Sequence, residues 1–108
     1  MKTYNKLVRD NIPAIIEANG RKANYRTLDN DEEYKQALKI KLIEESLELL
    51  SAKNEADELE ELVDIELIIN EIVEINKIDL IEYAHAFSIK NEKNGGFTKR
   101  YFLESADE

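Results

Sequence analysis

The stretches EESLE at residues 44–48 and ELVD at residues 61–64 determine how this chain is expected to fold. Each contains two carboxylates three positions apart, Glu45 with Glu48 and Glu61 with Asp64, and such pairs project from one face of a helix. Between them, SAKNEA at residues 51–56 is the weakest stretch separating two strongly helical runs, which predicts a turn. A hairpin folded near residues 54 and 55 places the two pairs level. The sequence therefore predicts an antiparallel helix hairpin with four carboxylates that face one another.

Four facing carboxylates repel one another unless a positive charge lies between them. Hard divalent cations take oxygen ligands, so Mg²⁺ is the natural candidate and Mn²⁺ the alternative. Both acidic pairs also lie on the apolar stripe of their helices, where an unpaired carboxylate is costly. A purely solvated acidic surface is the competing interpretation. We expect a metal site formed by Glu45, Glu48, Glu61 and Asp64.

Each of the two long helices is predicted to carry a second apolar stripe on its other side. On the first helix this stripe consists of Ile40, Ile43, Leu47 and Leu50. On the second helix it consists of Leu59, Leu62, Ile69 and Val73. A monomer of 108 residues can hardly cover both sides of both helices, so we expect at least a homodimer.

Capping patterns define the expected elements along the rest of the chain. They predict a short helix between Asp10 and Gly20, with Pro13 in its opening turn, and three longer helices at 30–51, 54–76 and 79–93. Residues 23–28 and 97–103 have the character of two short strands that could pair. The expected fold is a single all-α domain over residues 1–108, a small bundle of about four helices built round the central hairpin, with a short two-stranded β element.

Composition narrows the class of protein. The chain has 43% apolar and 36% charged residues, which is typical of a folded, helix-rich protein. It has no apolar run of the length that a membrane span needs and no apolar signal segment at its start. The absence of cysteine excludes a disulfide framework and favours a cytoplasmic location, and the single histidine argues against zinc.

Charge is unevenly distributed around the net value of −9. Residues 29–82 hold 18 acidic and 5 basic residues, whereas the two ends together are basic. Overall acidity argues against a nucleic-acid partner. An acidic centre between basic ends suits a metal that carries a phosphorylated small molecule.

The acidic spacing resembles a known enzyme signature. Glu44-Glu45-x-x-Glu48 followed after twelve residues by Glu61-x-x-Asp64 is similar to the E-E-x-x-E…E-x-x-D motif of the all-α nucleoside triphosphate pyrophosphatases, which include MazG-like enzymes. The opening YNKLVRDNIP at residues 4–13 and the closing GGFTK at residues 95–99 resemble the phosphoribosyl-ATP pyrophosphohydrolase-like, or house-cleaning, branch. Asn11 departs from that branch, where a basic residue is expected.

The resemblance implies an Mg²⁺-dependent hydrolase that converts a nucleoside triphosphate to its monophosphate and pyrophosphate. It implies Glu45, Glu48, Glu61 and Asp64 as metal ligands, with Glu44 and Glu45 as the catalytic residues. Glu44 is the candidate that positions or deprotonates the attacking water. Lys41 either contacts phosphate or pairs with a neighbouring acid. The basic ends supply further candidate phosphate contacts, Lys6, Arg9, Lys93, Lys99 and Arg100.

Two other functions compete with this one. A phosphoribosyl-ATP pyrophosphohydrolase of histidine synthesis would share the acidic motif, and the sequence does not separate it from a house-cleaning enzyme. A helical interaction or regulatory module would carry the same acids as a plain surface. It would bind no metal and show no turnover.

Overall fold

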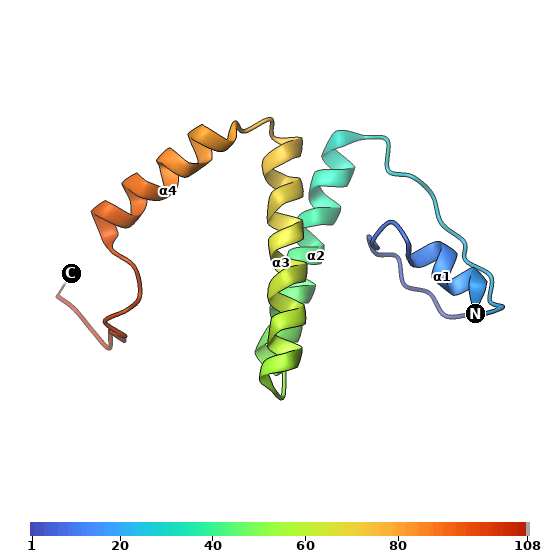
Figure 1. The fold of residues 1–108 in the computed structure, drawn as a ribbon, viewed down its shortest axis with the longest axis horizontal. Helices are drawn as coiled ribbons and strands as arrows, with labels where there is room; N and C mark the ends of the chain where they lie inside the picture. Colours follow the sequence, from blue (N-terminus) through green and yellow to red (C-terminus); the bar gives the residue numbers. More distant parts are fainter. Residues whose placement is uncertain (108) are drawn as a thin grey trace. The chain divides into compact units, whose positions relative to one another are not determined.

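The computed structural model describes residues 1–107, and within that range every regular element is a helix. The elements are α1 (Ile12–Ala18), α2 (Asp31–Ser51), α3 (Glu55–Ile75) and α4 (Leu80–Asn94) (Figure 1). The prediction of an all-α protein with about four helices is confirmed. The chain divides into two compact units, of which the first covers Met1–Lys77 and the second begins at Ile78. No helix in the described part is both long and apolar enough to cross a membrane.

Side-chain caps explain where the three longer helices begin. The Asn30 carboxamide accepts a hydrogen bond from the Glu33 backbone N–H at 3.0 Å, and Asn54 accepts one from Asp57 at 2.9 Å. The Asp79 carboxylate accepts from Ile81 at 2.7 Å. Each cap satisfies a backbone donor that has no partner within the helix. The predicted helix starts are therefore confirmed.

The prediction of a β element is wrong: residues 23–28 and 97–103 form no strand. Tyr25 is 68% exposed, so the alternation of residues 23–28 has no buried face to cover, and Arg26 instead pairs with Glu33 of α2. In the second segment the Arg100 N–H donates to the Phe97 carbonyl, and Arg100 has a φ of 59°. This left-handed residue closes a turn where a strand would need extended backbone.

Helices α2 and α3 lie side by side and are joined by residues 52–54 (Figure 1). The face of α2 that contacts α3 is the one predicted to carry Glu45. Among residues 1–107 the buried side chains are Leu38, Glu45 and Ile68. The Tyr34 hydroxyl donates to Glu71 at 2.8 Å and links the far ends of the two helices. The pKa of Tyr34 is raised to about 12. Burial is the largest cause, and the hydrogen bond to the Glu71 carboxylate is the second.

The opposite side of the helix pair is apolar and open. Ile43, Leu47 and Leu50 of α2 are 62%, 60% and 83% exposed. On α3 the predicted second stripe divides: Leu59 and Leu62 are exposed, whereas Ile69 and Val73 are half-buried. The first unit thus buries few side chains and leaves a large apolar surface uncovered.

Candidate metal centre

The acidic centre forms where the middle of α2 lies against the first half of α3. Glu45 is 5% exposed and lies in the row of Leu38, so α2 carries its carboxylate directly into the helix interface. Carboxylate oxygens of Glu45, Glu61 and Asp64 lie within 4.8 Å of one another. Oxygens of Glu44, Glu45 and Glu48 form a second group within the same distance. Glu45 belongs to both groups, so the structure brings all four predicted ligands and Glu44 together.

Two oxygens at the heart of this cluster have no hydrogen-bond partner. Oε2 of Glu45 and Oε2 of Glu61 are buried and unpaired within the part of the chain that the structure describes. Two ionised carboxylates can only accept hydrogen bonds, so their contact needs either a shared proton or a cation. An unpaired buried carboxylate oxygen is costly, and the all-oxygen donor set is the kind that Mg²⁺ and Mn²⁺ prefer. The residues present therefore fit a divalent cation.

The carboxylates that surround Glu61 disfavour its ionised form. The hydrogen bond that a protonated Glu61 would donate to the Glu45 carboxylate is the largest cause that raises the pKa of Glu61 to about 8. Desolvation and the nearby Glu48 carboxylate raise it further in the same direction. Like charges in a partly desolvated site suppress ionisation in this way. The metal-free centre therefore holds a proton at neutral pH that a bound cation would displace.

Two lysines form ion pairs with the acids on the Glu44 side of the cluster. The Lys6 ammonium lies 2.8 Å from Oε1 of Glu44, and the Lys41 ammonium lies 3.5 Å from both Glu44 oxygens and 3.4 Å from Oε1 of Glu45. The hydrogen bond from Lys6 is the main reason that the pKa of Glu44 is lowered, with Lys41 acting in the same direction. At neutral pH Glu44 is therefore ionised, whereas Glu61 is protonated.

One arginine forms an ion pair with an acid of α3. Nη1 of Arg9 lies 3.1 Å from Oδ1 of Asp64. Within residues 1–107, Glu48 and Glu61 have no ion-pair partner. The positive charges thus reach Glu44, Glu45 and Asp64, and they leave Glu48 and Glu61 without a compensating charge.

The remaining predicted contacts belong to the second unit. Lys93 lies in the last turn of α4. Lys99 follows that helix with its ammonium 5.9 Å from the ring centroid of Tyr101, and Arg100 occupies the left-handed turn position. Their role at the acidic centre stays a prediction. Asn11, the departure noted in the sequence, is the N-cap residue of α1 and makes no side-chain cap there.

The sequence did not predict that Lys6 and Arg9 would bind the acids directly, since both were expected to contact substrate phosphate. They lie three positions apart in an N-terminal stretch that contains a single acid, Asp10, before residue 17. That local excess of positive charge beside an acidic chain is the signal that could have indicated such a contact.

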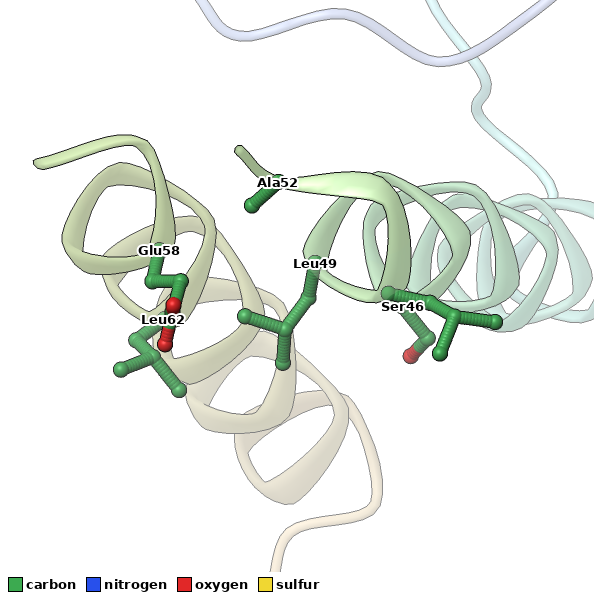
Figure 2. Close-up of a pocket in the computed structure, with 6 residues that line it drawn as sticks. Ser46, Leu49, Ala52, Glu58 and Leu62 are labelled. Atoms are coloured by element: carbon green, nitrogen blue, oxygen red, sulfur yellow. The ribbon is translucent and has the colours of Figure 1, made fainter. Parts of the chain in front are cut away.

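Two hollows lie along the helix pair. One of about 530 Å³ is near the turn, where Leu49 projects from α2 toward Glu58 and Leu62 of α3 (Figure 2). It is open and mostly apolar, and none of its lining residues belongs to the acidic centre. The other, of about 390 Å³, lies beside Asp64 and is lined by Arg9, Leu59, Glu60, Val63 and Asp64.

Comparison with known proteins gives no match to this chain among family models, curated proteins or solved structures. The indications of function are therefore the acidic centre and the resemblance of its motif.

Proposed function

We propose that this protein is an Mg²⁺-dependent nucleoside triphosphate pyrophosphohydrolase of the all-α, MazG-like kind, which removes non-standard nucleotides. The observation that carries the proposal is the convergence of five carboxylates around Glu45, two of which have buried oxygens without partners. A solvated acidic surface would not bury Glu45 to 5% exposure. The spacing of these acids along the chain also resembles the signature of that class.

Glu45, Glu48, Glu61 and Asp64 would hold the cation. When bound, Mg²⁺ would offset the negative charge of the triphosphate and favour attack at phosphorus. The chain itself supplies ligand oxygens from two helices joined by a short turn. That arrangement fixes their spacing before substrate arrives.

Glu44 is the proposed general base. Its lowered pKa keeps it ionised at neutral pH. Lys6 binds Oε1 at 2.8 Å, whereas Oε2 has the more distant Lys41 at 3.5 Å and is the oxygen freer to accept a proton. Water attacks the α-phosphorus, and its proton passes to Glu44. The bond between that phosphorus and the α–β bridging oxygen breaks, and pyrophosphate leaves with the bond electrons.

Cations near the centre would bind the phosphates. Lys41 is mostly buried beside Glu44 and Glu45, so it is positioned to balance charge at the base rather than to reach outward. Lys6 and Arg9 approach from the N-terminal segment and are more exposed. For Lys93, Lys99 and Arg100 of the second unit, contact with phosphate stays a prediction from the sequence.

The enzyme would work as a homodimer or higher homo-oligomer in the cytoplasm, with the α2–α3 pair at the centre of the assembled bundle. The support is the exposed row of Ile40, Ile43, Leu47 and Leu50, together with the open hollow beside Leu49 (Figure 2). An isolated unit with three buried side chains has too small a core for independent stability. A second copy of the chain would cover this surface.

A nucleotide panel tests the activity directly. Canonical and modified nucleoside triphosphates and phosphoribosyl-ATP are incubated with the protein, with and without Mg²⁺, and pyrophosphate release is measured. We expect release from at least one triphosphate, dependent on Mg²⁺. Turnover of phosphoribosyl-ATP alone would assign the chain to histidine synthesis, and no turnover across the panel would leave the interaction-module interpretation.

A further inference from the structure

We propose that the N-terminal segment, residues 1–11, closes the metal-free centre with its own positive charges and that Arg9 exchanges partners when the cation binds. In the metal-free chain Arg9 neutralises Asp64. On metal binding the guanidinium leaves Asp64 and becomes a phosphate ligand for the incoming triphosphate. This inference rests on the proposed function, because it assumes that Asp64 is a metal ligand.

The geometry of the ion pair permits such an exchange. Arg9 reaches Asp64 with a single nitrogen, at 3.1 Å, and its side chain is 65% exposed, whereas that of Asp64 is 28% exposed. The guanidinium thus approaches the acid from the solvent side. It can rotate away without opening the interface between α2 and α3.

Charge supplies the reason for the exchange. A guanidinium next to a ligand oxygen repels a divalent cation at the same carboxylate, so the two compete for Asp64. The cation would interact more strongly than the guanidinium, because it would also bind the unpaired oxygens of Glu45 and Glu61. A released arginine then retains all its donors for phosphate, to which its planar fork is well matched.

The segment is tied to the helix pair loosely enough to move. Among the described residues its polar side-chain links to α2 and α3 are Lys6 with Glu44 and Arg9 with Asp64. Leu7 and Val8 between them are half-buried, and Asn5 precedes them in a left-handed conformation with a φ of 46°. Local displacement of Arg9 therefore breaks one exposed ion pair and no backbone ladder.

Space for the exchange lies beside the pair. The hollow of about 390 Å³ is lined by Arg9 and Asp64 themselves, and by Leu59, Glu60 and Val63 of α3. It offers room for the displaced guanidinium together with a phosphate group. Lys41 differs in this respect, because it belongs to α2 and stays beside Glu44 and Glu45 whether or not a metal is bound.

Calorimetric titration of the metal-stripped chain with Mn²⁺ tests the competition. We expect Arg9→Ala to bind Mn²⁺ about two- to fivefold more tightly than the wild type, the factor that an exposed ion pair represents. Lys6→Ala is the matched control, since it removes one positive charge from the same cluster but from an acid that is not a proposed ligand. Its gain should be smaller. Arg26→Ala, which removes an ion pair to Glu33 away from the centre, should leave Mn²⁺ affinity unchanged.

The proposed contact of Arg9 with phosphate is tested with a triphosphate that carries a methylene group in place of the α–β bridging oxygen. Its binding is measured with Mn²⁺ present. Here Arg9→Ala should bind the nucleotide several-fold more weakly. One substitution is therefore expected to raise the affinity for Mn²⁺ and lower the affinity for the nucleotide. Arg9→Gln, which keeps a long polar side chain, serves as a second variant should the alanine variant lose helicity by circular dichroism.

The outcomes separate this inference from the proposed function. Unchanged or weaker Mn²⁺ binding in Arg9→Ala overturns the exchange, and so do equal gains in Arg9→Ala and Lys6→Ala, which would reflect net charge alone. Unchanged nucleotide affinity overturns the phosphate role. A wild-type chain that binds no Mn²⁺ overturns the proposed function and the exchange together.

Discussion

The two faces of the α2–α3 pair reverse the usual arrangement of a soluble helix. The face where the helices meet holds Glu45, Glu61 and Asp64, while the outward face presents Ile43, Leu47 and Leu50 to solvent. A solvated helix pair would place the acids outward and the aliphatic side chains inward. The inner face therefore gathers acids at buried and half-buried positions, and the outer face leaves aliphatic side chains exposed. This inversion supports the proposed cation site on the inner face and the proposed second copy of the chain on the outer face.

The largest expected effect concerns the inner face. Asp64→Asn or Glu48→Gln keeps the shape of a proposed ligand and removes one negative charge, so pyrophosphate release should fall by about 10²–10³-fold or more. Helix content, measured by circular dichroism, should be unchanged. Glu58→Gln is the control, because Glu58 is an exposed acid of α3 that lies outside the cluster. Equal activity in all three variants would refute the assignment of the centre.

Metal binding should also stabilise the inner face directly. A cation that binds the native state at one hundred times its Kd adds about 2.7 kcal/mol to the free energy of unfolding. For a chain of this size that corresponds to a rise in Tm of roughly 10–20 °C. The measurement is thermal unfolding of metal-stripped protein with and without millimolar Mg²⁺ or Mn²⁺. A Tm indifferent to both ions would mean that no metal site exists.

The outer face is tested by comparing two leucines on α2. Leu38 is 3% exposed, so Leu38→Ala should cost about 2–5 kcal/mol in any state of assembly. Leu47 is 60% exposed, and in a lone chain Leu47→Ala should cost less than about 0.5 kcal/mol. If a second copy covers the outer face, the cost rises to about 2 kcal/mol and Tm depends on protein concentration. Sedimentation equilibrium that gives a monomer mass at micromolar concentration would rule out the covering copy.

A further expected effect is a pH dependence that arises at Glu61. Its pKa is raised from 4.5 to about 8 in the folded chain, so its contribution to stability is complete below about pH 4.5 and declines as pH rises through 8. Metal-free protein should therefore lose stability between pH 5 and pH 8, by denaturant titration. Glu61→Gln should flatten that decline, and saturating Mg²⁺ should reverse it. A decline of equal slope in Glu61→Gln would assign the effect to another group.

Local chemistry explains why the helices and the acidic register could be predicted. Asn30, Asn54 and Asp79 each cap the helix that follows them, and a cap acts within a few residues of its own position. The register of the acids follows from the i, i+3 spacing and a short turn, which are also local. The burial of Glu45 follows from its place in the apolar row of Leu38.

The features that were missed depend on contacts between distant segments. The strand expected at residues 23–28 had a pattern of only six residues, and strand character is decided by the surface on which it packs. Lys6 and Arg9 lie in a stretch without helical or strand periodicity, so their pairing with Glu44 and Asp64 reflects tertiary placement. Sequence separations of 38 and 55 residues are beyond the reach of a local pattern.

The short connection at residues 52–54 also has a consequence for how the chain folds. Helices joined so closely meet through local contacts, which form early because little loop entropy is lost. We therefore expect the opposed acids to approach one another in the same event that pairs the helices, so that their repulsion acts in the folding transition state. A divalent cation or mildly acidic solution should for that reason speed refolding of the helix pair, in addition to slowing its unfolding.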